Sequence, residues 1–392
     1  MGHPCIQSTL DVLLVSVTSH DLYCVFHVEV DGFNHASLAT INHRLLGASQ
    51  MIDRTIQDIV NVRRIINGPS DMFRAISYSR YPWTRDIWTK MIANIWQTDD
   101  VQLTRDKIEF PLLEQGQQTA IRRATAFLSN LDSIQVDNLT ENVATFITDP
   151  DIAKCLRRQA AEEDIHVDTY SVIIETMFDD PLNIYDMYRH VPKLSAKNDF
   201  IIAQGKTVRD TPNDQNKIKA LVSNIALEGI YFFSGFLTFY TIGRSTGKIQ
   251  GAIDGIKYIQ RDEVVHLELF TLILQSLRRE SPELFTAELV EECRQILINA
   301  TLFEIEWGCF AIEEGVLGLT RHIYTHFLQG RANKCSENAG LGTIFENVEN
   351  TVPWFDEFSK VNKTETNFFE GKPQAYSHRK LSFGSKPAKP KM

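Results

Sequence analysis

Two short motifs with the same spacing hold the residues best suited to chemistry in this chain. They are Glu163-Asp-Ile-His166 and Glu263-Val-Val-His266, each inside a segment with helical periodicity. A spacing of three residues puts both side chains of a pair on one helix face. A surface salt bridge between glutamate and histidine has the same spacing, so one motif alone is a weak signal. Together the four side chains offer the oxygen and nitrogen ligands that suit iron or manganese.

The faces on which the two motifs lie are otherwise apolar. The first face continues through Ile152, Leu156, Tyr170, Ile173 and Met177, and the second through Ala252, Ile256, Ile259, Phe270, Ile273 and Leu277. Burying a carboxylate or an imidazole is costly unless the group is paired, and a cation offsets the charge of several carboxylates at once. The apolar setting therefore favours a buried metal site over surface salt bridges and over a metal-free bundle.

Two further segments each contribute one carboxylate. Asp132 lies in the helical segment 128–135, and Glu228 is the only charge in the apolar segment 220–243. That apolar segment is long enough to cross a bilayer, but a carboxylate near its middle would cost a few kcal/mol in lipid. We therefore expect a helix buried inside a bundle, with a partner for its lone carboxylate.

The predicted ligand set therefore has four carboxylates and two histidines. Its members are Asp132, Glu163, His166, Glu228, Glu263 and His266. Ferritin-like di-iron carboxylate bundles have this ligand arrangement: two helices each supply one carboxylate, and two others each supply a Glu-x-x-His pair. Two metals held close together can reduce oxygen jointly, which a single ferrous ion does poorly.

Composition narrows the class of protein. The 392 residues carry a formal net charge of −10, which argues against non-specific binding to nucleic acid or to an anionic membrane. The six cysteines are far apart and form no C-x-x-C pair, so a reducing, cytoplasmic location is expected.

Helical periodicity dominates from about residue 63 to residue 329 and predicts at least five long helices. In Asp149-Pro150 the aspartate can cap a helix and the proline can occupy its first turn, so a helix should run from there to about Phe178. Val12 to Val30 alternates as a strand would, and the end of the chain is rich in Lys, Gly, Pro and Ser. We expect an N-terminal segment of unknown role at 1–62, an all-α dimetal bundle at 63–355, and a flexible tail at 356–392.

The order and spacing of four motifs resemble one known family. Leu131-Asp-Ser-Ile-Gln135, Glu163-x-x-His-x-x-x-Tyr170, Leu227-Glu-Gly-Ile230 and Arg261-Asp-Glu-Val-Val-His266 are similar to the small subunit of class I ribonucleotide reductase, over residues 64 to 383. The resemblance implies a ferritin-like fold, a homodimer, and two iron ions per chain that react with O2; manganese uses the same ligand types. It also implies a catalytic large subunit as partner, to which a tyrosyl radical passes for ribonucleotide reduction.

The resemblance assigns the radical to Tyr170, four residues after His166. It implies an apolar pocket for the ring, here formed by Phe232, Phe236 and Ile259. The ordinary alternative for a lone tyrosine is a core residue with a hydrogen-bonded hydroxyl.

The resemblance also implies a path for the electron. Trp96 matches a relay tryptophan, Asp262 matches the aspartate that joins it to His166, and Tyr376 matches a tail tyrosine that passes the radical to the large subunit. The basic end, Lys386 to Met392, departs from family tails, which are apolar and acidic, so docking through Leu381 and Phe383 is a weaker expectation.

Two other functions are compatible with such a bundle. A dimetal oxidase or oxygenase on the same scaffold would not need Trp96, Asp262 or Tyr376. A non-enzymatic iron-binding bundle would make Tyr170 and the aromatic tail incidental. The chain has no phosphate-binding loop and no suitably paired cysteines, so we do not expect it to reduce ribonucleotides alone.

Overall fold

The computed structural model describes residues 56–69, 71, 73–74 and 77–355. The strand-like segment 12–30 and the predicted tail with Tyr376, Leu381 and Phe383 lie outside these residues. A boundary between two compact units falls between Ile59 and Val60, and every described candidate ligand belongs to the second unit.

The described part of the chain is helical, as the sequence predicts. Its longer helices are α3 (Trp83–Ala93), α5 (Gln115–Asp137), α6 (Pro150–Met177), α9 (Pro192–Asp210), α10 (Asp214–Ala226), α11 (Phe233–Thr246), α12 (Gln250–Glu280), α13 (Ala287–Ala311) and α14 (Arg321–Asn338). The shorter ones are α2 (Ile56–Asn61), α4 (Thr104–Glu109), α7 (Pro181–Tyr185) and α8 (Met187–His190). An isolated antiparallel bridge joins Ile66 to Ile147.

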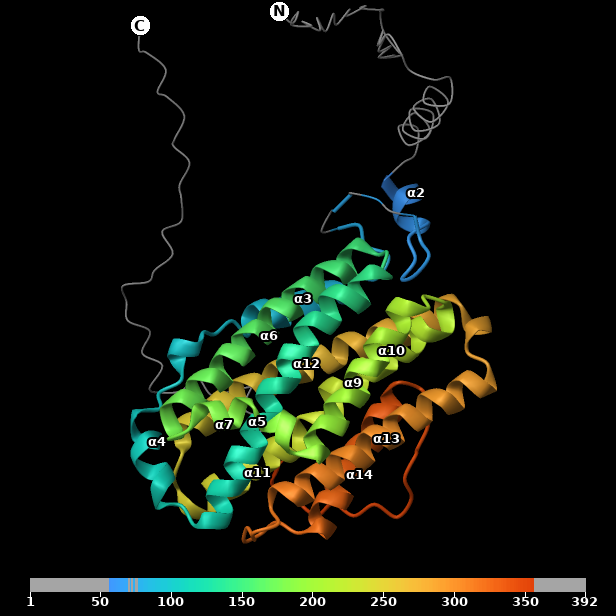
Figure 1. Cartoon of the computed structure of the whole chain (residues 1–392). Helices are drawn as coiled ribbons and strands as arrows, with labels where there is room; N and C mark the ends of the chain where they lie inside the picture. The colour runs from blue at the N-terminus through green and yellow to red at the C-terminus, as the bar shows by residue number, and fades with distance from the viewer. Residues whose placement is uncertain (1–55, 70, 72, 75–76, 356–392) are drawn as a thin grey trace, which may run out of the picture. The chain divides into compact units, whose positions relative to one another are not determined.

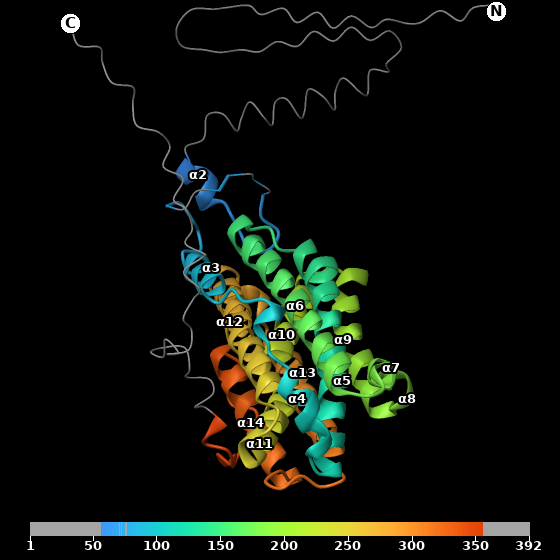
Figure 2. The ribbon, with the colours of Figure 1, turned by 90° about the vertical axis from the view of Figure 1, so that its left-hand side faces the viewer.

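The long helices lie side by side in a bundle (Figure 1). Helix α5 packs on α6 and on α11, and α12 packs on α6 and on α10. The turned view in Figure 2 shows α6 and α12 running along the length of the bundle, and α13 packs on α14. The four segments that carry the predicted ligands therefore meet in the interior.

The start of α6 follows the predicted capping chemistry. The Asp149 side chain accepts hydrogen bonds from the backbone N–H groups of Asp151 and Ile152, both at 3.0 Å, and Pro150 occupies the first turn. The helix ends at Met177, one residue before the predicted Phe178. The local sequence therefore sets the register that brings Glu163 and His166 to the core.

Helices α10 and α11 join through a turn of π-helix, η5 (Leu227–Tyr231). The run Asp214–Thr246 is the one among the described residues that is long and apolar enough to cross a membrane, and its most apolar window is 100% buried within the bundle. A π-helical turn inserts one residue into the helical ladder, and such turns are frequent at functional sites. Glu228 lies in this turn and is fully buried.

The segment that follows α14 folds back along that helix. The side-chain oxygen of Asn333 accepts hydrogen bonds from the backbone N–H groups of Ile344 and Phe345, at 3.0 and 2.9 Å. Further along, the Thr351 hydroxyl donates to the Ile323 carbonyl at 3.2 Å, and Phe355 is 1% exposed. The last described residues are therefore fixed to α14.

Candidate dimetal centre

The six predicted ligands converge from four elements and are all 0% exposed. Asp132 comes from α5, Glu163 and His166 from α6, Glu228 from η5, and Glu263 and His266 from α12. They form two overlapping groups, Asp132, Glu163, His166 and Glu263 in one, and Glu163, Glu228, Glu263 and His266 in the other. Within each group the ligand atoms lie within 4.8 Å of one another. Glu163 and Glu263 belong to both groups, which is the position of a bridging carboxylate.

Both histidines turn the same ring nitrogen toward the cluster. His166 Nδ1 lies 3.1 Å from both Glu163 and Glu263, and 3.7 Å from Asp132. His266 Nδ1 is 2.9 Å from Glu263 Oε2, 3.2 Å from Glu163 and 4.0 Å from Glu228. In each ring this leaves Nε2 to contact an outer partner.

Several carboxylate oxygens in the cluster have no hydrogen-bond partner although they are buried. They are both oxygens of Asp132, Oε2 of Glu228 and Oε1 of Glu263. Buried polar atoms without a partner are costly, and unpaired carboxylates more so. Divalent cations are the natural partners of buried carboxylate oxygens, so the residues fit a dimetal centre.

The electrostatics of the cluster lead to the same conclusion. Burial, and then the charge of Glu163, raise the pKa of the Asp132 and Glu228 carboxyl groups well above the usual range. Burial alone would raise the pKa of Glu163 too, but His266 and His166 outweigh it and lower that pKa to about 2. Four carboxylates cannot all stay ionised in so small a buried volume without added positive charge.

Two glutamine amides that the sequence analysis did not identify hold Glu228. Gln159 Nε2 donates to Glu228 Oε1 at 2.7 Å and lies 3.1 Å from Glu163 Oε1, and Gln135 Nε2 donates to the same oxygen of Glu228. Both glutamines are 0% exposed. They occupy the apolar faces of α5 and α6, and a long polar side chain on such a face was the signal available in the sequence.

The structure brings Trp96 and Asp262 of the predicted relay together with the ligand His166, whereas Tyr376 lies outside the described residues. Asp262 Oδ2 accepts from Trp96 Nε1 at 2.6 Å and lies 3.4 Å from His166 Nε2. The Trp96 ring is stacked on the His166 ring with centroids 6.0 Å apart. Tyr258, which is half-buried, packs against Trp96 with centroids 5.2 Å apart. A continuous contact thus leads from the first histidine through Trp96 to a tyrosine that reaches solvent.

The second histidine has a different outer partner. His266 Nε2 lies 3.0 Å from Glu162 Oε2, and Arg158 Nε donates to Glu162 Oε1 at 3.0 Å. Glu162 is 2% exposed, and the sequence analysis did not identify it. The available signal was an additional acid directly before the ligand Glu163. The two histidines therefore differ, since one is joined to a tryptophan through Asp262 and the other to an arginine through Glu162.

This asymmetry gives a prediction for Glu162→Gln. The neutral amide loses the ion pair with Arg158 and weakens the hydrogen bond that orients His266, so we expect the affinity for one of two metal ions to fall about 10-fold or more. Competition with a chelator of known affinity measures the change. Asp168→Asn, on an exposed position of the same helix, is the matched control. Equal metal retention in the two variants would contradict a positioning role for Glu162.

Tyr170 lies in the core of α6 and is 0% exposed. Its hydroxyl has no hydrogen-bond partner, unlike that of an ordinary buried tyrosine. Burial, followed by the negative charges of Asp132 and Glu263, raises the pKa of this phenol well above its usual range. Phe232, Phe236 and Ile259 are each 0% exposed, and their contact with the Tyr170 ring stays a prediction.

Comparison with known proteins agrees with this geometry. The family model described as "Ribonucleotide reductase, small chain" matches residues 75–353. The ribonucleoside-diphosphate reductase subunit beta of Treponema pallidum is 32% identical over 320 residues, which cover 80% of this chain and 91% of that protein.

Solved structures give the same relationship. The ribonucleotide reductase R2 subunit from Clostridium botulinum has 33% identity and a TM-score of 0.73, covering 76% of this chain and 95% of that one. The dimanganese(II)-NrdF of Streptococcus sanguinis, at 20% identity and a TM-score of 0.63, covers 74% of this chain and 100% of that one and is similar in fold. The predicted all-α, ferritin-like fold is confirmed by this likeness.

Proposed function

Because the chain belongs to the ribonucleotide reductase small-chain family, and is thus the small subunit of a ribonucleoside-diphosphate reductase, we propose that its bundle binds two iron ions and uses O2 to oxidise Tyr170 to a radical. The observation that carries the proposal is the pair of overlapping ligand groups that share Glu163 and Glu263. The helix that supplies Glu163 also holds Tyr170, a buried tyrosine whose hydroxyl has no hydrogen-bond partner.

Each part of the ligand set has a separate task in this proposal. Asp132 and His166 would hold one ion, Glu228 and His266 would hold the other, and Glu163 and Glu263, which belong to both groups, would serve both ions. Bound iron supplies one-electron redox chemistry and the site at which oxygen is reduced; manganese suits the same ligands. The amides of Gln135 and Gln159 fix the Glu228 carboxylate without adding charge to the site.

The surroundings of Tyr170 determine how the side chain can be oxidised. Because the Tyr170 ring is fully buried, the charged phenolate is disfavoured, and the neutral phenol is the form that would be oxidised. The full burial of the ring excludes water and reductants from the radical afterwards. Phe232, Phe236 and Ile259 are the proposed apolar lining.

A radical buried in a bundle cannot touch a substrate bound to another protein, so transfer requires intermediate groups. We propose that His166, Asp262 and Trp96 form the inner part of the path, supported by the contacts among them. Tyr376, outside the described residues, is the proposed outer member. The proposed partners are the catalytic large subunit and a second copy of this chain, and the proposed location is the cytoplasm.

An electron paramagnetic resonance spectrum, recorded after iron and oxygen are added to the metal-free protein, tests the function. A tyrosyl signal, with nucleotide reduction once the large subunit is added, is the expected result. An oxidase or oxygenase would consume oxygen continuously without a lasting radical, and a storage protein would accumulate iron beyond two ions per chain. Either of those results would overturn the proposal.

The proposal also predicts the metal content of ligand variants. Glu228→Ala and His266→Ala should each lose at least one of two ions per chain, since each removes a ligand of the second ion. Elemental analysis of the loaded, desalted proteins measures this. Glu268→Ala replaces a partly exposed glutamate of α12 and is expected to keep both ions. Full occupancy in both ligand variants would contradict the assignment.

A further inference from the structure

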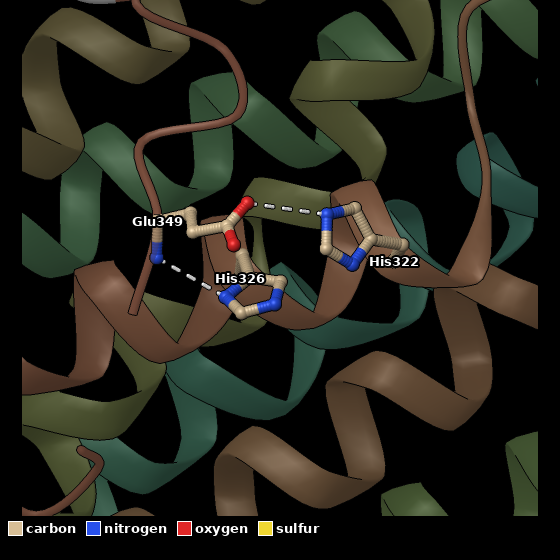
Figure 3. A group of neighbouring side chains, drawn as sticks. All are labelled: His322, His326 and Glu349. Carbon is tan, nitrogen blue, oxygen red and sulfur yellow. Dashed lines mark hydrogen bonds and ion pairs between the residues drawn. The ribbon is translucent and has the colours of Figure 1, made fainter. Parts of the chain in front are cut away.

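A second cluster of metal-ligating side chains lies outside the dimetal centre. His322 and His326 are four residues apart at the start of α14, and Glu349 comes from the segment that folds back along that helix. Side chains at this spacing share one helix face. Figure 3 shows the two rings and the Glu349 carboxylate turned toward one another.

The three side chains are already close enough to share an ion. His322 Nε2 lies 3.4 Å from Glu349 Oε2, and the two imidazole rings have centroids 4.4 Å apart. One ligand atom from each residue lies within 4.8 Å of the others. The backbone N–H of Glu349 donates to His326 Nδ1 at 3.1 Å, so the carboxylate-bearing residue is held against the rings from its main chain (Figure 3).

The chemistry of this donor set selects a class of ion. Two imidazoles and one carboxylate are the protein ligands of open zinc sites, in which water takes the fourth position. Mg²⁺ and Ca²⁺ prefer oxygen ligands and would compete poorly for two imidazoles. His322 and Glu349 are exposed, which leaves the open side of the cluster to solvent.

We propose that His322, His326 and Glu349 bind one divalent transition-metal ion of the zinc class, separate from the dimetal centre. The ion joins the first two turns of α14 to the segment that follows this helix, which already has its own contacts with it through Asn333 and Thr351. Binding would therefore hold Glu349 against α14, a few residues before position 356, where the predicted tail begins. This site does not depend on the radical chemistry proposed for Tyr170.

Two features set a limit on the affinity. The N-terminal turn of a helix carries partial positive charge, which opposes a cation at His322, and the carboxylate of Glu349 has to offset that charge. An ion that takes Nδ1 of His326 also displaces the Glu349 N–H, which is released toward solvent. The expected site is therefore weaker than a fully enclosed structural zinc site.

The test is a zinc titration of the full chain after the dimetal centre has been loaded with iron. The protein is dialysed against excess Mg²⁺, titrated with Zn²⁺ in the presence of a chromophoric chelator, and assayed for retained iron. We expect one zinc ion per chain in the unaltered protein. His322→Gln and His326→Gln should each weaken zinc binding about 10-fold or more with unchanged iron content, because each removes one of three ligands.

The control is His190→Gln, which alters an exposed histidine of α8 paired with Asp186 at 2.7 Å. It should bind zinc as the unaltered protein does. If the double variant His322→Gln/His326→Gln binds zinc as tightly as the control, the ion is held elsewhere and the proposal is wrong.

Hydrogen exchange tests the fastening separately. Zinc should slow amide exchange in residues 344–355 of the unaltered protein, apart from Glu349, whose N–H loses its acceptor on His326, and should leave exchange in the double variant unchanged. Zinc binding at the cluster without such slowing would overturn the fastening role.

Discussion

Replacing Tyr170 by phenylalanine is expected to leave both metal ions in place and to reduce the tyrosyl signal and nucleotide reduction to background. Phenylalanine fills the same buried volume but has no hydroxyl to give up an electron and a proton. Because the Tyr170 hydroxyl has no hydrogen-bond partner, its removal should not destabilise the fold and could stabilise the metal-free protein by about 1 kcal/mol. Three measurements on one variant check this: metal content, the resonance spectrum and chemical denaturation.

A matched control separates the loss of this hydroxyl from the loss of any buried one. Tyr324 is also 0% exposed, but its hydroxyl is 2.7 Å from that of Thr238 and so has a partner. Tyr324→Phe should therefore lose about 1 kcal/mol of stability and keep the radical. If the tyrosyl signal persisted in Tyr170→Phe and disappeared in Tyr324→Phe, the radical would reside on Tyr324 and the assignment to Tyr170 would be wrong.

The ligand positions could be predicted from sequence because several constraints agree at each one. Three features coincide at the two Glu-x-x-His motifs: a spacing of three residues, a helical period and an otherwise apolar face. The motifs are Glu163 with His166 and Glu263 with His266. The boundary of α6 was predictable for a similar reason, since Asp149 and the following proline both favour a helix start there.

The π-helical turn at Glu228 could not be predicted in the same way. Leu227 to Tyr231 has no local composition that separates a π turn from an α turn, and the additional residue is accommodated by packing against neighbouring helices. The sharing of Glu163 and Glu263 between two ligand groups was also inaccessible, because it depends on how closely α6 and α12 approach.

The partners of the ligands were missed for a different reason. Glu162 and Gln159 were missed because a long polar side chain on a helix usually faces water, although Gln159 lies on the apolar face that also carries Glu163. Glu349 was missed because it pairs with His326 across 23 residues of chain, in a segment with no helical period. Contacts of that kind come from tertiary structure alone.

The second large effect is expected for Trp96→Phe. Trp96 donates to Asp262 at 2.6 Å and stacks on His166, so phenylalanine keeps a ring in the same place but loses the N–H donor and the readily oxidised indole. We expect the Tyr170 radical to persist and the large subunit to bind, while nucleotide reduction falls to background. The variant should lose about 2 kcal/mol of stability, since a hydrogen bond to a charged group is removed.

Two comparisons decide whether the loss comes from the relay or from the fold. Trp88→Phe alters a different tryptophan, which lies in α3 and packs against Lys154, with the Lys154 Nζ 3.6 Å from the ring centroid. This variant should support nucleotide reduction normally. Asp262→Asn keeps the indole but replaces the charged link to His166 with a neutral amide, so a relay through that link predicts a large loss of turnover there as well. A loss in Trp96→Phe but not in Asp262→Asn would mean that the electron passes between the stacked rings directly. Full turnover in Trp96→Phe would remove the tryptophan from the path, because no phenylalanine can be oxidised in its place.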